Sequence, residues 1–114
     1  MRDARRGRKF GRETDARRAL LSGLASSLII NGKIRTTEAR AKEVRKFLEP
    51  IITKARKQTM IARRMVGAQL NARAATRVMT IAKGYENRNG GYLRITKMGT
   101  RAGDAARVAL IEFV

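Results

Sequence analysis

The chain has 114 residues, and its 27 Lys and Arg against 9 Asp and Glu give a formal net charge of +18. It contains no Cys and no His, which excludes disulfides, thiolate metal sites and histidine-based acid–base catalysis. Such an excess of positive charge destabilises a compact state through self-repulsion. Binding to a polyanion offsets that cost, because each Lys or Arg on a phosphate releases a counterion condensed on the polyanion. The composition therefore predicts a protein that binds a polyanion, most simply a nucleic acid.

The length allows one domain with a modest hydrophobic core. Aromatic residues make up only 4% of the chain, which argues against a single-strand binder that stacks bases on aromatic side chains. No apolar run approaches the roughly 20 residues that span a bilayer, and no apolar signal-peptide core follows the basic start. We therefore expect an intracellular protein without a membrane partner.

Residues 1–13 are expected to form a basic N-terminal arm, because Phe10 is their only large apolar residue apart from Met1 and cannot make a core. Residues 14–114 are expected to form a single globular domain. The basic residues of the arm are Arg2, Arg5, Arg6, Arg8, Lys9 and Arg12.

The first helix is predicted to begin near Thr14-Asp15 and to end at Asn31-Gly32, both of which tolerate positive φ. Leu20, Leu24 and Leu28 recur at helical spacing and supply its apolar stripe. Its first turns also carry Arg17 and Arg18, where the helix dipole disfavours a cation, and a bound phosphate would offset that cost.

A short strand is expected from Lys33 to Thr36, followed by a helix that Thr36 or Thr37 caps, with Glu38 in its first turn. The apolar positions of this second helix continue to Ala55. Pro50 falls inside the pattern and is expected to kink the helix or to split it near Glu49.

The stretch 54–83 contains no acid and is predicted to form two helices, separated near Leu70-Asn71. Its basic side chains are all expected to point outward, although charges on the solvated face of a helix can be spectators. These side chains are Lys54, Arg56, Lys57, Arg63, Arg64, Arg73, Arg77 and Lys83. The apolar face of the first of the two helices is expected to comprise Ile61, Met65, Val66 and Leu70.

The C-terminal part alternates apolar and polar residues at 92–97 and ends in a mostly apolar segment at 108–114, with a glycine-containing loop at 99–104 between them. These segments predict two strands paired as a hairpin, which completes the order α-β-α-α-α-β-β. In the loop we expect Arg101 to contact phosphate and Asp104 to hold the loop by accepting hydrogen bonds. An exposed hairpin tip without a partner is an equally fair reading.

No motif indicates catalysis. Gly90-Gly91 lacks the surroundings of a P-loop or dinucleotide fingerprint and is interpreted as a turn. The carboxylate pairs Glu13/Asp15 and Glu38/Glu43 have basic neighbours but no nucleophile or metal ligand beside them, so we interpret them as capping and helix-surface charges. A nuclease would need an acid cluster for Mg²⁺, which is missing here. We expect no enzyme, no metal and no cofactor.

Several blocks of the sequence resemble the bacterial large-subunit ribosomal protein seventeen family. The resemblance runs from end to end and is looser only in 54–83. It is carried by Gly11-Arg12, by RRALLSGLASSLI at 17–29, by IRTTEARAKEVRKFLEPIIT at 34–53 and by RNGGYLRITKMGTRAGDAARVALIEFV at 88–114.

The resemblance implies an α+β fold, a two-layer α/β domain with helices on one side of a small mixed sheet. It also implies a structural protein of the cytoplasmic ribosome that binds large-subunit ribosomal RNA near the rim of the peptide exit tunnel, with neighbouring ribosomal proteins as further partners and no small-molecule substrate. RNA contact is then expected at Arg2, Arg5, Arg6, Arg8, Lys9, Arg12, Arg17, Arg18, Lys33, Arg35, Arg94, Lys97 and Arg101.

The chain departs from the family pattern at Asp3 and Ala16, where His is frequent, and at Arg107, where Pro is frequent. Two other kinds of function stay open on charge alone. A chromosomal DNA-binding protein would have the same charge, although no helix-turn-helix pattern is evident. A membrane-active cationic protein would need an apolar face that the charged arm lacks.

Overall fold

The computed structural model describes residues 14–114, so every expectation placed on the basic arm lies outside the described residues. The described chain forms helices and strands in the order α-β-α-α-α-β-β, which confirms the predicted order. The elements are α1 (Thr14–Asn31), β1 (Lys33–Thr37), α2 (Glu38–Ala55), α3 (Met60–Gly67), α4 (Ala72–Lys83), β2 (Leu93–Thr100) and β3 (Arg107–Phe113).

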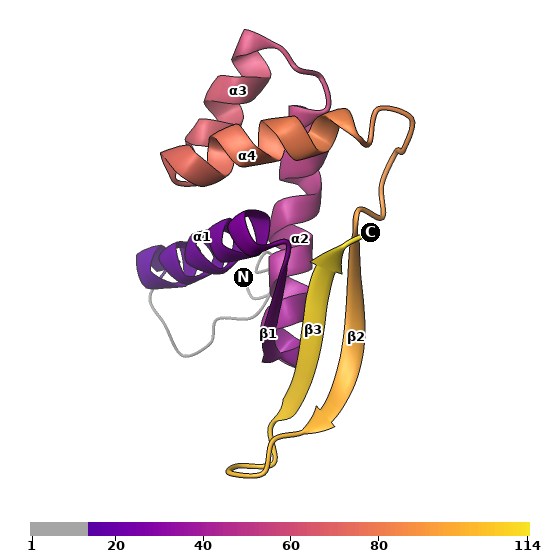
Figure 1. Ribbon diagram of the computed structural model, residues 1–114. Helices are drawn as coiled ribbons and strands as arrows, with labels where there is room; N and C mark the ends of the chain where they lie inside the picture. The colour runs from indigo at the N-terminus through magenta and orange to yellow at the C-terminus, as the bar shows by residue number, and fades with distance from the viewer. Residues whose placement is uncertain (1–13) are drawn as a thin grey trace, which may run out of the picture.

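The three strands form one sheet in the order β1-β3-β2, and both pairings are antiparallel (Figure 1). The expectation of a mixed sheet was therefore wrong. The two strands that run in the same direction, β1 and β2, lie on opposite sides of β3, so no parallel pair of neighbours exists. The predicted hairpin of the last two strands is confirmed, with a register shift between Lys97 and Gly99.

The helices lie on one side of the sheet, as expected. Helix α2 runs along the sheet, and α1, α3 and α4 pack around α2 (Figure 1). Cross-strand pairing places Ile34, Ile111 and Ile95 side by side in one row. Ile111 is fully buried, and the other two pack against the core, so this row faces the helices.

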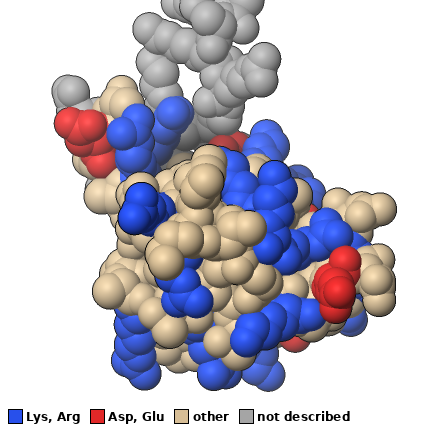
Figure 2. Space-filling view, turned by 90° about the horizontal axis from the view of Figure 1, so that it is seen from above, with Lys and Arg blue, Asp and Glu red and all other residues tan. Residues whose placement is uncertain are grey.

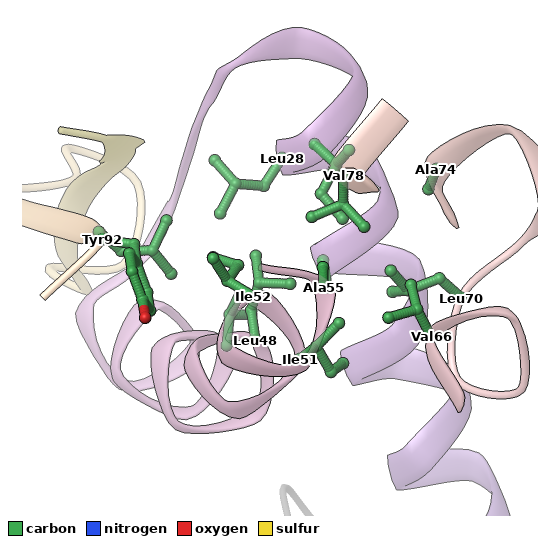
Figure 3. Packing of buried hydrophobic residues seen from close by; sticks show 14 of the residues in the cluster. Leu28, Leu48, Ile51, Ile52, Ala55, Val66, Leu70, Ala74, Val78 and Tyr92 are labelled. Atoms are coloured by element: carbon green, nitrogen blue, oxygen red, sulfur yellow. The ribbon is translucent and has the colours of Figure 1, made fainter. Parts of the chain in front are cut away.

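The core joins all four helices to the sheet (Figure 3). Its labelled side chains come from the four helices, from Leu70 in the connection between α3 and α4, and from Tyr92 after α4. Tyr92, just before β2, is the largest fully buried side chain. Burial of this kind stabilises by about 25 cal/mol per Å² of apolar surface removed from water, which lets a small fold tolerate a large net charge.

Helix boundaries follow the capping chemistry of the sequence. The amide N–H of Gly32, at φ 83°, donates to the Leu28 carbonyl at 2.7 Å and ends α1 where predicted. The hydroxyl of Thr37 caps α2 by accepting from the Arg40 N–H. Helix α2 is continuous through Pro50, so the chain is not split there. Pro50 is exposed, and water can therefore reach the Lys46 carbonyl that loses its intrahelical donor.

The two predicted helices of the stretch 54–83 are α3 and α4, and the separation near Leu70-Asn71 is confirmed. The predicted apolar face of α3 was partly wrong. Val66 is buried as expected, but Ile61 is 70% exposed and Met65 42% exposed, and Ala62 takes their place in the core. With only 8 residues, α3 can turn just one narrow face toward α2 and α4, so its further apolar residues stay outside.

Candidate nucleic-acid interface

The uncovered face of the sheet gathers three of the predicted RNA-contacting residues. The register pairs Lys33 with Glu112, and it pairs Arg94 with Glu112 from the other side. Arg35 lies one row further along, opposite Leu110. Because side chains alternate between the faces of a strand, Lys33, Arg35 and Arg94 point away from the helix-facing row of Ile34, Ile111 and Ile95. All three are exposed.

We call this surface the outer sheet face, defined by Lys33, Arg35 and Arg94. Around these cations it presents the exposed Thr96 and the half-buried Leu110 and Glu112. The three cations come from both edge strands, so they span the width of the sheet rather than one edge. A surface of this kind suits the phosphate backbone of folded RNA, which is recognised mainly by shape and charge.

Lys97 does not belong to the outer sheet face. Its position in the register puts it with the helix-facing residues, opposite Ala109. Its Nζ lies 4.0 Å from a Glu38 carboxylate oxygen, and the Lys42 Nζ lies 3.1 Å from the same oxygen. The hydrogen bond from Lys42 is the main cause that lowers the pKa of Glu38, partial burial opposes it, and the charges of Lys42, Lys97 and Arg107 add to the lowering. Lys97 is 74% exposed, so it is still able to meet a second anion.

Glu38 and Glu43 were interpreted as capping and helix-surface charges, and this interpretation was partly wrong. Glu38 does lie in the first turn of α2, but both side chains are buried, at 9% and 5% exposure. Each forms an ion pair with a lysine of its own helix, to Lys42 and Lys46 respectively. The two glutamates therefore anchor lysines on α2.

The hairpin tip holds Arg101 in place. The Nε and Nη2 of Arg101 donate to the two carboxylate oxygens of Asp104 at 3.0 and 2.7 Å, and the Ala106 N–H donates to the same carboxylate at 3.1 Å. These bonds lower the pKa of Asp104 to about 2 and raise that of Arg101. The predicted role of Asp104 in holding the loop is thereby confirmed. The fixed arginine is exposed at the end of the molecule.

Arg17 and Arg18 lie at the start of α1, away from the sheet. Arg18 is exposed and lines a cavity of about 550 Å³ together with Asp15, Phe47 and Gln69. The structure therefore distributes the described members of the predicted site over three places, namely the start of α1, the outer sheet face and the hairpin, rather than gathering them in one pocket. A dispersed arrangement fits a partner that is larger than the protein.

The described residues contain no group of three or more His, Cys, Asp or Glu side chains that could hold a metal ion. Within residues 14–114, no helix is both long enough and apolar enough to cross a bilayer.

The family model of ribosomal protein L17 matches residues 20–114 of the chain. The large ribosomal subunit protein bL17 of Chlorobium chlorochromatii is 46% identical over 117 residues, covering 100% of this chain and 75% of that protein. The bL17 proteins of Chlorobaculum tepidum and Nautilia profundicola are each 48% identical. The alignments cover 100% and 94% of this chain and 74% and 93% of those proteins. The chain belongs to the ribosomal protein L17 family.

Two of the positions that were expected to depart from the family pattern lie among the described residues. Ala16 is exposed in the first turn of α1, one position before Arg17. Arg107 is exposed at the start of β3, opposite Thr100, and its charge helps to lower the pKa of Glu38. Arg107 thus adds a cation near Lys97 and Lys42, at the end of the sheet that carries the hairpin tip.

One basic residue that was expected to point outward does not. Arg56 is half-buried and donates from Nη1 to the Tyr92 hydroxyl at 3.2 Å, and from Nη2 to the Glu86 carbonyl at 3.0 Å. The Tyr92 hydroxyl in turn donates to the Arg88 carbonyl at 3.2 Å. This guanidinium therefore holds the 84–91 connection against α2. No local pattern in the sequence distinguishes the half-buried Arg56 from the exposed basic residues of the same stretch.

Proposed function

We infer that this protein is a structural constituent of the large ribosomal subunit and that it binds and stabilises large-subunit ribosomal RNA. Membership of the ribosomal protein L17 family carries this inference, because the relatives are large ribosomal subunit proteins. Its partners are ribosomal RNA and other ribosomal proteins, and its place is the cytoplasmic ribosome. It is a structural component rather than an enzyme.

The charge distribution supports binding to ribosomal RNA through its phosphates. Each Lys or Arg that neutralises a phosphate releases a condensed counterion, which drives binding without reading the sequence. The outer sheet face offers three such cations on a rigid surface, and Arg101 is pre-oriented by Asp104. Phosphate contacts of this kind position the protein and hold neighbouring RNA segments in their folded arrangement.

We propose that RNA contact is made by Arg17, Arg18, Lys33, Arg35, Arg94, Lys97 and Arg101 in the described chain, and by the basic residues of 1–13. We further propose that the protein sits near the rim of the peptide exit tunnel, with residues 1–13 reaching between RNA helices. Both proposals rest on the resemblance and on the exposure of the described cations, of which only Arg17 is half-buried.

Sedimentation tests the function directly. The protein should co-migrate with the large ribosomal subunit at low salt and be released at high salt, because binding through phosphates weakens steeply with ionic strength. A protein that stays at the top of the gradient at every salt concentration would contradict the inference. In a competition assay, structured ribosomal RNA should displace the protein from duplex DNA, and the reverse preference would support a chromosomal protein instead.

The arm is tested by replacing Arg5, Arg6, Arg8 and Lys9 with Ala. If each contacts one phosphate, the slope of log K against log salt should become shallower by about 0.7–0.9 per lost contact. An unchanged slope would remove these residues from the interface while leaving the family function intact.

A further inference from the structure

A groove lies between α1 and α4, outside every place where RNA contact was predicted. Its volume is about 600 Å³, and it is lined by Ile30 of α1 and by Arg73, Thr76, Arg77 and Thr80 of α4. None of these residues contributes to the outer sheet face or to the hairpin tip.

The spacing of the lining residues explains why they share this groove. Positions 73, 76, 77 and 80 follow the i, i+3, i+4, i+7 pattern and therefore lie on one face of α4. The other face of α4 is packed into the core through Ala74, Ala75, Val78, Met79 and Ala82. The orientation of the groove-lining face is thus set by the burial of its opposite face.

The helix that carries the two arginines is held both at its start and in its second half. Asn71 caps α4 by accepting from the Ala74 N–H at 2.8 Å. The side-chain amide of Gln58, a residue at φ 56°, donates to the carbonyls of Ala55 and Met79 at 2.9 and 2.8 Å and so ties α4 to the end of α2. The arginines therefore project from a fixed support, and only their side chains have to be ordered on binding.

Within the described structure, Arg73 and Arg77 have no ion pair and no side-chain hydrogen bond. Both are exposed, and no Asp or Glu occurs between Glu49 and Glu86 in the sequence. Lys97 and Arg101 differ, since each lies beside a carboxylate. The guanidinium groups of the groove are consequently free to bind an external anion without first breaking an internal pair.

The floor and wall of the groove suit a polynucleotide backbone. The hydroxyls of Thr76 and Thr80 donate to the carbonyls of Ala72 and Thr76, at 3.1 and 3.5 Å, so a ligand does not have to accept hydrogen bonds from them. These short side chains leave room between Arg73 and Arg77, which stand one helical turn apart. Ile30 offers an apolar wall against which a ribose can pack.

We propose that this groove binds the phosphodiester backbone of large-subunit ribosomal RNA, with Arg73 and Arg77 as the phosphate ligands. The proposal rests on the proposed function and adds a second RNA site to it. In Figure 1 the hairpin tip lies at one end of the molecule, and α4 lies toward the other, in a fold whose longest dimension is 44 Å. The protein therefore bridges two RNA segments, one at the groove and one at the hairpin and outer sheet face.

The distribution of charged side chains agrees with a second site. Figure 2, which views the molecule from the end that carries α3 and α4, shows Lys and Arg side chains across the surface and Asp and Glu only toward its margins. The groove is open and is lined by residues of two helices. A long, flexible polyanion is the ligand that its open shape fits.

The first experiment measures binding of the full chain to purified large-subunit ribosomal RNA as a function of salt. Arg73→Ala combined with Arg77→Ala should make the slope of log K against log salt shallower by about 1.4–1.8, since two phosphate contacts are lost at about 0.7–0.9 each. Both residues are exposed on a helix and Ala is the best helix former, so the variant should fold. An unchanged slope would overturn the proposal.

A matched control removes the same charge from the neighbouring helix. Arg63→Ala with Arg64→Ala lies outside the groove and should change the slope less than the groove variant does. An equal change would show that only net charge matters and would overturn the groove assignment. Arg73→Lys with Arg77→Lys keeps both charges and should retain most of the wild-type slope, whereas loss of the slope in this variant would also count against phosphate binding.

The second experiment tests the bridge. The chain has no Cys, so Thr76→Cys and Ala102→Cys each create a unique attachment point for an iron chelate that cleaves nearby RNA. In reconstituted large subunits, the label at position 76 should cleave an RNA segment different from the one cleaved from the hairpin tip at position 102. Cleavage of the same segment from both positions would contradict the bridge. Absence of cleavage from position 76 alone would contradict the groove.

These outcomes separate the two levels of inference. A wild-type protein that fails to bind ribosomal RNA at low salt would contradict the proposed function itself. A wild-type protein that binds with the expected salt dependence, together with a groove variant that binds identically, would contradict only the second site.

Discussion

The helical end of the molecule and the hairpin tip hold their positive charges by different means. At the hairpin tip, Arg101 is fixed by an exposed ion pair with Asp104. At the helical end, made of α3 and α4, the framework is fixed by neutral caps and by side chains that bind backbone carbonyls, and the stretch from Pro50 to Tyr85 contains no acid. The order of the tip should therefore depend on pH and salt, and the fold of the helical end should not.

The comparison also shows that an arginine without an acidic neighbour is not automatically a ligand for RNA. Arg56 and Arg73 both belong to the acid-free stretch. Arg56 uses its donors on Tyr92 and on the Glu86 carbonyl, whereas Arg73 has no such partner in the described structure and lines an open groove. The surroundings in space, rather than the local sequence, decide which charge supports the fold and which is offered to a partner.

The largest effect on the free energy of unfolding is expected at Tyr92, which lies between the helical end and the hairpin. Tyr92→Ala removes a fully buried ring that packs beside Tyr85, with ring centroids 5.1 Å apart. The cavity should lower the free energy of unfolding by about 3–5 kcal/mol in urea denaturation. Tyr92→Phe keeps the ring and loses only the hydroxyl, so it should cost clearly less. Equal losses for both variants would mean that the hydroxyl network, and not packing, accounts for the stabilisation by Tyr92.

Arg56→Ala should destabilise the protein without weakening RNA binding. The change removes the Arg56 donor from the buried Tyr92 hydroxyl, which should cost about 1–3 kcal/mol of unfolding free energy, whereas the exposed Glu86 carbonyl can bond to water instead. Limited proteolysis should then cut the 84–91 connection sooner than in the wild type. The salt dependence of binding to ribosomal RNA should stay the same, and a shallower slope would show that Arg56 contacts phosphate after all.

Asn71→Ala should remove the cap of α4 and cost about 1 kcal/mol, as typical caps do. Thermal unfolding followed by circular dichroism would measure the loss. Asn71→Asp is the matched control, because a carboxylate caps equally well, and it should retain the wild-type stability. A helical end that unfolds at the same temperature in both variants would imply that tertiary packing alone determines where α4 begins.

The smallest effect is expected at the hairpin tip. The pKa of Asp104 is about 2 when it is paired and 3.8 as a free side chain. Because pairing lowers the pKa, the contribution of the pair is present above pH 3.8 and is lost as the pH falls through about 2. Carboxyl NMR signals should report this midpoint for Asp104, and amide exchange near Arg101 should speed up over the same range. A midpoint near 3.8 would mean that the pair is not maintained in solution.

Much of the local structure followed from residue chemistry. Gly32, Thr37 and Asn71 lie where predicted helix boundaries were found, because φ preference and side-chain capping are properties of single residues. Of the two outcomes expected at Pro50, the split near Glu49 was wrong, because α2 continues through this exposed residue. The prediction that Ile61 and Met65 are buried was wrong, because periodicity marks an apolar face of a helix without showing whether a neighbouring element covers that face.

The candidate site was foreseeable in its residue types but not in its arrangement. Lys33, Arg35 and Arg94 form one surface only because β3 lies between their strands, and the sequence separation between β1 and β2 conceals that register. Lys97 was predicted alongside them, yet strand alternation turns it toward Glu38. The groove residues Arg73 and Arg77 attracted no special weight, because an acid-free helix has the same sequence whether its polar face lines a groove or faces open solvent.

By itself, the sequence determined the net charge, the order of helices and strands, and the absence of histidine or cysteine chemistry, because each depends on composition or on residues close together in the chain. The tertiary structure alone decided that the sheet is antiparallel throughout, that Arg56 supports the fold, and which cations share a surface. These properties depend on which distant segments meet. Hydrophobic burial and strand pairing select those meetings over the whole chain at once, and local patterns do not encode them.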